Sequence, residues 1–269
     1  MGHKERKLVM VKLGGSVITE INNPFTARIK TIKRLVSEEA RAKKETGFSL
    51  LQGHGGGSFA HDAAVFYKLR RKSSKAIAMT QVALKDINSI IVDRLARVGL
   101  RPFPFHPSNI MYSNNGQIQE AWCSGINIAL DKGLTPVVHG DVLLDATNGI
   151  HVASTESVFL PLAFKLHPKK IVLVTDVAGV FDSNPKTNPD AKLIPIIDSS
   201  NVQEVIKLSA GKATGRENLT GAMGTKVELA YLMAKFAGTT VYIANGNKPG
   251  LLRDILLDKE GAECTIIRA

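Results

Sequence analysis

Residues 48–61 read Phe-Ser-Leu-Leu-Gln-Gly-His-Gly-Gly-Gly-Ser-Phe-Ala-His, a short apolar run that ends in a cluster of glycines. The run predicts a buried strand over 48–52, because it is short, apolar and followed by glycines. Ser58 is a residue type that caps helices, so we expect a helix from Phe59 to about Leu69. This order is typical of a phosphate-binding unit, since the loop N–H groups and the helix dipole both favour an anion.

Two further glycine-bearing segments each carry a lysine. Residues 11–16 read Val-Lys-Leu-Gly-Gly-Ser, and residues 220–226 read Thr-Gly-Ala-Met-Gly-Thr-Lys. A lysine beside such a loop adds a compact positive charge for phosphate oxygens. No stretch of the chain has the Gly-x4-Gly-Lys-Ser/Thr form of a P-loop. Together the three segments predict a site for a nucleotide and a second, anionic substrate, which indicates a kinase.

Strand-like and helix-like segments alternate along the chain, which predicts an α/β fold built of βαβ units around a mainly parallel sheet. Expected strands lie at 8–13, 48–52, 135–139, 170–175, 240–243 and 264–267, with a hairpin at 142–144 and 150–153. Expected helices lie at 27–44, 59–69, 75–98, 121–132, 157–166, 202–209 and 226–237. Ligands of such sheets bind at the carboxyl ends of the strands, where the first two glycine loops fall.

The composition is that of a folded protein with excess positive charge. Of 269 residues, 44% are apolar and 22% are charged, and the net charge is +11. That charge attracts phosphate, nucleic acid or an acidic surface without choosing among them. Cys123 and Cys264 lie far apart, which favours two thiols in a reducing cytosol. No apolar stretch approaches the ~20 residues that span a bilayer, so we expect a soluble, cytoplasmic protein without a membrane partner.

Single histidines and acids are the other site candidates. His61 lies early in the expected helix after the glycine loop, where it can donate a hydrogen bond to a phosphate oxygen, whereas His54 is expected to be structural. Asp141 and Asp176 each follow an expected strand and are candidates to hold a lysine or contact the nucleotide. Glu156 begins an expected helix, where its charge suits the helix dipole. No side-chain cluster has zinc or calcium spacing, so we expect no protein metal site, only Mg²⁺ carried with the nucleotide.

These segments, in this order, resemble the amino acid kinase superfamily, and most closely its small-phosphate branch, the isopentenyl phosphate kinases. Residues 54–61 are similar to that branch's His-Gly-(Gly/Ala)-Gly-Ser-Phe-Gly-His signature, and its other loops resemble residues 12–16, 136–141, 175–180, 220–226 and 245–247. The resemblance implies one domain over 1–269, an open αβα sandwich with an acceptor half (about 1–165) and a nucleotide half (about 166–269). It also implies a homodimer that phosphorylates isopentenyl phosphate with ATP in isoprenoid biosynthesis.

The resemblance further implies roles for single residues. Lys12 and Lys226 would neutralise the transferring phosphoryl group, and Glu156 takes the place of an aspartate that orients these lysines. The acceptor would be bound by Gly56, Gly57, His61 and Thr155. ATP would be bound by Lys12, Gly14, Gly15, Ser16, Gly57, Asp176, Gly179, Gly221 and Lys226. Because the acceptor phosphate is already an anion, no general base is needed, and catalysis is placement plus charge stabilisation.

Several positions depart from the family pattern. Residues 154–156 read Ser-Thr-Glu where the family has Ser-Gly-Asp, so we expect Thr155 to crowd the acceptor phosphate. Asn218 stands where the family has Asp, and residues 19–20 lack the basic residue often seen there. These departures leave two alternatives open, a fosfomycin-type phosphonate kinase and a non-catalytic nucleotide- or oxyanion-binding protein. A nucleic-acid binder, suggested by charge alone, ranks last.

A five-carbon acceptor tail needs an apolar cavity, which separates the isopentenyl phosphate hypothesis from the fosfomycin alternative. The expected helices that follow His61 offer candidate lining residues, namely Val65, Phe66, Met79, Val82 and Ile87.

Overall fold

The computed structural model describes residues 7–185, 187–209 and 223–269, which form two sheets and the helices around them. The larger sheet has eight strands in the order β10-β12-β11-β9-β1-β2-β6-β3. Neighbouring strands from β3 to β11 run parallel, and β12 is antiparallel to β11. The strands are β1 (Leu8–Leu13), β2 (Ser49–His54), β3 (Pro102–Pro104), β6 (Thr135–His139), β9 (Lys170–Thr175), β10 (Ile196–Ile197), β11 (Thr240–Asn245) and β12 (Cys264–Ile267).

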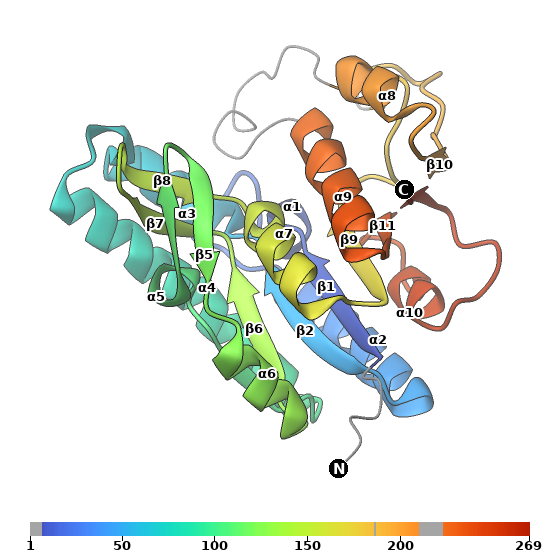
Figure 1. Ribbon diagram of the computed structural model, residues 1–269, viewed down its shortest axis with the longest axis horizontal. Helices are drawn as coiled ribbons and strands as arrows, with labels where there is room; N and C mark the ends of the chain where they lie inside the picture. The colour runs from blue at the N-terminus through green and yellow to red at the C-terminus, as the bar shows by residue number, and fades with distance from the viewer. Residues whose placement is uncertain (1–6, 186, 210–222) are drawn as a thin grey trace.

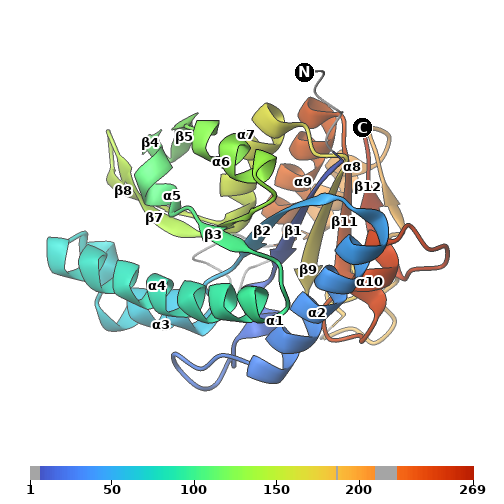
Figure 2. The same ribbon diagram turned by 90° about the horizontal axis from the view of Figure 1, so that it is seen from below.

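Helices cover both faces of this sheet, so the expected αβα sandwich is confirmed (Figures 1 and 2). One face is covered by α2 (Ile29–Thr46), α4 (Ser74–Arg97) and α10 (Leu251–Leu256). The other is covered by α6 (Ser124–Asp131), α7 (Thr155–Leu166), α8 (Val202–Ser209) and α9 (Met223–Ala237). No helix in the described ranges is long and apolar enough to cross a membrane.

The second sheet has four strands in the order β5-β4-β7-β8. They are β4 (Met111–Asn114), β5 (Gln117–Ala121), β7 (Asp141–Asp145) and β8 (Gly149–Ala153), so the expected hairpin is confirmed. Leu69, Leu84 and Val142 belong to a small apolar cluster that packs this sheet against α4 and the preceding helix, α3 (Gly57–Phe66). This layer therefore extends the molecule beyond the edge of the large sheet (Figure 2).

Most element predictions are confirmed to within a few residues, but the Ser58 cap is wrong. The residue that precedes α3 is Gly56, and Ser58 lies inside the first turn, with its backbone N–H donated to Thr19 Oγ1 (3.0 Å). The helix also ends at Phe66 rather than Leu69, and a 3-10 turn follows at Leu69–Arg71. The short elements α1 (Gly15–Ile18), α5 (Pro107–Ile110), β4, β5, β10 and α10 were not predicted.

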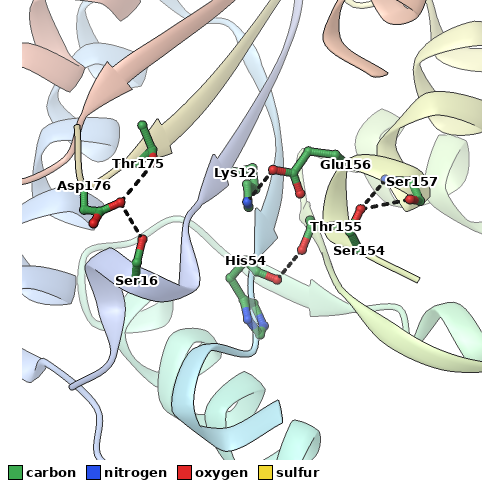
Figure 3. A network of polar contacts seen from close by, with 9 residues as sticks. All are labelled: Lys12, Ser16, His54, Ser154, Thr155, Glu156, Ser157, Thr175 and Asp176. Carbon is green, nitrogen blue, oxygen red and sulfur yellow. Dashed lines mark hydrogen bonds and ion pairs between the residues drawn. The ribbon is translucent and has the colours of Figure 1, made fainter. Parts of the chain in front are cut away.

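The alternation of side chains along β1 decides which way Lys12 points. Leu8 and Met10 pack into the core on the α7 and α9 side, whereas Val9, Val11 and Leu13 pack on the α2 side. Since side chains along a strand alternate between faces, Lys12 shares the face of Leu8 and Met10. Its ammonium is thus directed toward the start of α7 at the carboxyl end of the strand (Figure 3).

Candidate active site

A buried ion pair joins β1 to α7 at this edge of the sheet. Lys12 Nζ donates a hydrogen bond to Glu156 Oε1 over 2.7 Å, and the two residues are 7% and 5% exposed (Figure 3). Lys12 lies in register with Gly53 on β2, where a Cβ would come within 2.5 Å of the Phe159 ring. Glycine at 53 therefore lets α7 approach the strand ends closely enough for the pair to form.

Two lysines keep the Glu156 carboxyl ionised. Burial alone would raise its pKa, but the charges of Lys12 and Lys226, with the hydrogen bond from Lys12, hold the pKa at about 2. Lys226 lies in the first turns of α9, which packs against α7. The structure thus brings together three of the predicted catalytic residues, Lys12, Glu156 and Lys226, and both lysines stabilise the negative charge of the Glu156 carboxylate.

Thr155 is accommodated inside the protein. Its side chain is 2% exposed, and its hydroxyl donates to the backbone oxygen of His54 over 2.8 Å. The same oxygen accepts the N–H of Gly140 (3.3 Å), so the ends of β2, β6 and α7 meet at one carbonyl. Ser154 caps α7 by accepting the N–H of Ser157 (3.0 Å). The Thr155 hydroxyl is therefore used by the fold, and the crowding of the acceptor phosphate by Thr155 stays a prediction.

The first two glycine loops pack directly on each other. A Cβ on Gly15 would lie 2.5 Å from the backbone nitrogen of Gly57, and Gly57 has a positive φ of 51°. Thr19 bridges the loops, since its Oγ1 donates to the Gly15 oxygen (2.8 Å) and accepts from Ser58. Gly14 donates its N–H to the Val174 oxygen (2.9 Å). Close packing is thus one reason for these glycines, and the Gly14 N–H is already used within the protein.

On the β9 side, Asp176 is tied to the first loop. Ser16 Oγ donates to Asp176 Oδ1 over 3.0 Å, and Thr175 Oγ1 lies 3.3 Å from the same oxygen (Figure 3). Gly179 packs against β12, where a Cβ would come within 2.4 Å of Thr265 Oγ1. Ser16 and Asp176 therefore form a second polar cluster at the same edge of the sheet.

The histidines lie in two different environments. His61 lies in the second turn of α3, partly exposed, with Nδ1 3.1 Å from Asp62 Oδ1. His54 is fully buried, with Nε2 3.0 Å from Asn88 Oδ1, and burial lowers its pKa to about 4. It stacks beside His139, whose burial likewise lowers its pKa to about 4. His54 is thus a neutral structural group, and the prediction for it is confirmed.

Other predicted residues are not gathered into the site. Ile87 belongs to the core on the α2 side, while Val65, Phe66 and Val82 are exposed, so these side chains do not line one tail cavity. Asp141 is buried and accepts the backbone N–H groups of Ser108 and Val142, a structural role. Gly221, like Asn218 and Thr220, lies outside the described residues.

The arrangement suits anionic ligands. Across the described ranges, no three His, Cys, Asp or Glu side chains gather in a way that could hold a metal ion. Glu156 is paired with Lys12, and Asp176 accepts from Ser16. Two cations beside glycine loops and helix starts favour phosphate oxygens.

Sequence reasoning missed the residues that fix the loops. Thr19 and Asn88 were not predicted to have a role, and neither belongs to a motif. His106 was missed as well, although its Nδ1 lies 3.0 Å from Nε2 of His139. The side of the sheet that Lys12 faces could not be found from the sequence of β1, because all six of its residues are buried.

Comparison with known proteins shows the family to which the chain belongs. The model of the amino acid kinase family matches residues 7–245. An isopentenyl phosphate kinase of Methanothermobacter thermautotrophicus is 32% identical over 94% of this chain and 96% of its own length. One from Thermoplasma acidophilum is 28% identical over 97% and 100%, respectively. A solved structure of an isopentenyl phosphate kinase superposes with a TM-score of 0.81, at 30% identity over 97% of this chain and 99% of that one. The chain therefore belongs to the amino acid kinase family, within which it is similar over nearly its whole length to isopentenyl phosphate kinases.

Proposed function

We propose that this protein transfers the γ-phosphoryl group of ATP to isopentenyl phosphate, forming isopentenyl diphosphate and ADP in isoprenoid biosynthesis. The observation that carries the proposal is the buried Lys12–Glu156 pair, with Lys226 nearby, at the edge of the sheet where the glycine loops meet. The names of the full-length relatives support the choice of acceptor.

The chemistry of this cluster is charge stabilisation. Phosphoryl transfer spreads negative charge over the oxygens of the transferring group, and fixed cations in a water-poor site stabilise that charge. Glu156 stays ionised at neutral pH, so it positions Lys12 without taking its proton. Lys12 and Lys226 are proposed to contact the transferring group from β1 and α9.

The two substrates are proposed to enter from opposite sides of Lys12. ATP would lie toward β9, in contact with Gly15, Ser16, Asp176 and the loops that carry Gly14, Gly179 and Gly221. The acceptor phosphate would lie at the start of α3, on Gly56, Gly57 and His61, beside the backbone of Thr155. Mg²⁺ would come with ATP and add positive charge on its phosphate oxygens. We also propose a homodimer in the cytoplasm.

An ADP-release assay with Mg-ATP tests the proposal, using isopentenyl phosphate, dimethylallyl phosphate and fosfomycin in parallel. We expect kcat/KM above ~10⁴ M⁻¹s⁻¹ with isopentenyl phosphate, which is ordinary enzyme efficiency. Turnover of fosfomycin alone would move the protein to the phosphonate alternative. ATP binding with no turnover of any acceptor would favour the non-catalytic alternative.

His61→Ala tests the acceptor site itself. We expect kcat/KM for the acceptor to fall about a hundredfold while the Kd of ATP stays unchanged, because His61 contacts only the acceptor phosphate in this proposal. His167→Asn is the matched control, since asparagine tolerates the left-handed backbone that His167 adopts at the end of α7. Unchanged acceptor kinetics in His61→Ala would contradict this placement of the acceptor.

A further inference from the structure

The turn between α3 and α4 is both basic and apolar. Residues 63–85 contain six lysines and arginines and no aspartate or glutamate. Five of the six lie within residues 68–75, and all five are exposed. At the end of α3, Val65 and Phe66 are 60% and 72% exposed. We call residues 65–75 the basic tip.

The backbone of the basic tip is held in place by contacts with the rest of the protein. Lys68 and Lys72 have φ values of 56° and 52°, which non-glycine residues rarely adopt, and they flank the 3-10 turn. Leu69 anchors this turn in the apolar cluster beneath it, and Lys72 Nζ donates to the Asn148 oxygen over 2.6 Å. Both views place the tip at the end of the molecule farthest from α10 (Figures 1 and 2).

The charges of the tip have no acidic partner within the described part of the chain. None of its five cations forms an ion pair with a carboxylate there. The Lys12–Glu156 and Ser16–Asp176 contacts use none of the tip residues. Its positive potential and its apolar side chains are therefore both available to a partner.

We propose that the basic tip docks this protein on an anionic phospholipid surface, with Phe66 and Val65 entering the headgroup region. Clusters of four to eight basic residues beside exposed apolar side chains match such surfaces in charge and polarity. A nucleic acid is the poorer match, because base stacking would use the Phe66 ring but leave Val65, which is also exposed, without an apolar partner. A second copy of this chain would bring the same positive charge. Docking of this kind needs no membrane-spanning helix. It does change one prediction made from the sequence, because it adds a peripheral membrane contact where no membrane partner was expected.

Vesicle sedimentation of the full chain tests the proposal. We expect binding to phosphatidylcholine vesicles that contain about 30% phosphatidylserine, no binding to pure phosphatidylcholine, and loss of binding as salt rises. The double variant R70E/R71E should bind at least about tenfold more weakly, because it reverses two charges at the surface. F66S should weaken binding about tenfold through the lost apolar contact.

The matched control is K30E/K33E, which changes the net charge equally at exposed positions of α2, far from the tip (Figure 1). It should alter binding less than about twofold, since charge remote from the surface is screened. The proposal is overturned if the wild type does not bind anionic vesicles, if it binds neutral ones equally, or if the control weakens binding as much as R70E/R71E. Binding of the wild type to single-stranded DNA but not to vesicles would also overturn the proposal. The proposal would also be overturned if R70E/R71E raised the KM of the acceptor while the wild type did not bind vesicles. The basic tip would then attract the substrate rather than a membrane. ATP turnover without lipid is measured on every variant, which separates this proposal from the catalytic one.

Discussion

Two buried glutamates on opposite faces of the same sheet differ in charge. Glu156, on the α7 side, is paired with Lys12, and its pKa is held at about 2. Glu39, on the α2 side, is fully buried, and burial raises its pKa well above the ordinary value. Its neighbour is the neutral Gln52, whose Oε1 also has no donor among the described residues.

Since both acids are buried, the groups beside each acid decide whether it is charged. A protonated Glu39 can donate its O–H to Gln52 Oε1, and this satisfies both groups without any cation. Glu156 has two lysines nearby and so keeps its charge at the ligand edge of the sheet. Four predictions test this contrast, from the largest expected effect to the smallest.

Glu156→Gln should cause the largest loss of stability. The substitution leaves the Lys12 ammonium buried without its counter-charge, so we expect the free energy of unfolding to fall by about 3–5 kcal/mol. Chemical denaturation at pH 7.5 measures it, with Glu39→Gln as the matched control. A loss below about 1 kcal/mol would mean that the pair is not buried as described.

The buried histidines extend the contrast to bases. The pKa values of His54 and His139 are lowered from 6.5 to about 4, so the unfolded chain takes up protons in this range before the folded one does. Their contribution to stability is therefore complete above pH 6.5 and is lost as pH falls toward 4, about 3 kcal/mol for each histidine. Unfolding free energies measured from pH 7.5 to 4.5 should fall less steeply for His54→Asn than for the wild type. Parallel pH profiles would refute the assignment of His54.

Thr155→Val tests the contact that fixes the start of α7. Valine has the same shape but cannot donate to the His54 oxygen, so we expect a loss of about 1–2 kcal/mol in unfolding free energy. Turnover should also fall, because Glu156 follows directly in the helix. Thr155→Ser keeps the hydroxyl and should retain both properties. Equal behaviour of the two variants would show that the hydroxyl does not matter.

Glu39→Gln should have the smallest effect and the opposite sign. Since the pKa of Glu39 is raised in the folded state, the unfolded chain loses its proton first, and the residue reduces stability as pH rises above about 4.5. Glutamine carries no such cost, so the variant should gain about 1 kcal/mol at pH 8 and little near pH 4.5. A gain that does not depend on pH would mean that Glu39 is not the neutral acid described.

Local patterns predicted the sheet and much of the site. The apolar runs of β1, β6 and β9 are short and end in turn residues, so their bounds followed from the sequence. The glycine loops correctly placed Lys12 near the end of a strand and His61 in the helix that follows the second loop. The smaller sheet was half missed, because β4 and β5 are short and β5 is mostly exposed.

The pairing at the centre of the site could not be read from local patterns. Lys12 and Glu156 are 144 residues apart, and only the fold brings them together. The direction of the Thr155 side chain depends on the carbonyl of His54, which no motif encodes. Gly56 rather than Ser58 precedes α3, because the positive φ of Gly57 and its packing on Gly15 fix the loop before Ser58 is reached.

The most direct test compares Glu156→Gln with Glu39→Gln in the ADP-release assay with isopentenyl phosphate at pH 7.5. Both variants turn a buried glutamate into glutamine on the same sheet, but only one removes a charge that positions Lys12. We predict that kcat/KM falls at least about a hundredfold in Glu156→Gln and stays within about twofold of wild type in Glu39→Gln. Near wild-type turnover in Glu156→Gln, or an equal loss in both variants, would contradict the role proposed here for the buried ion pair.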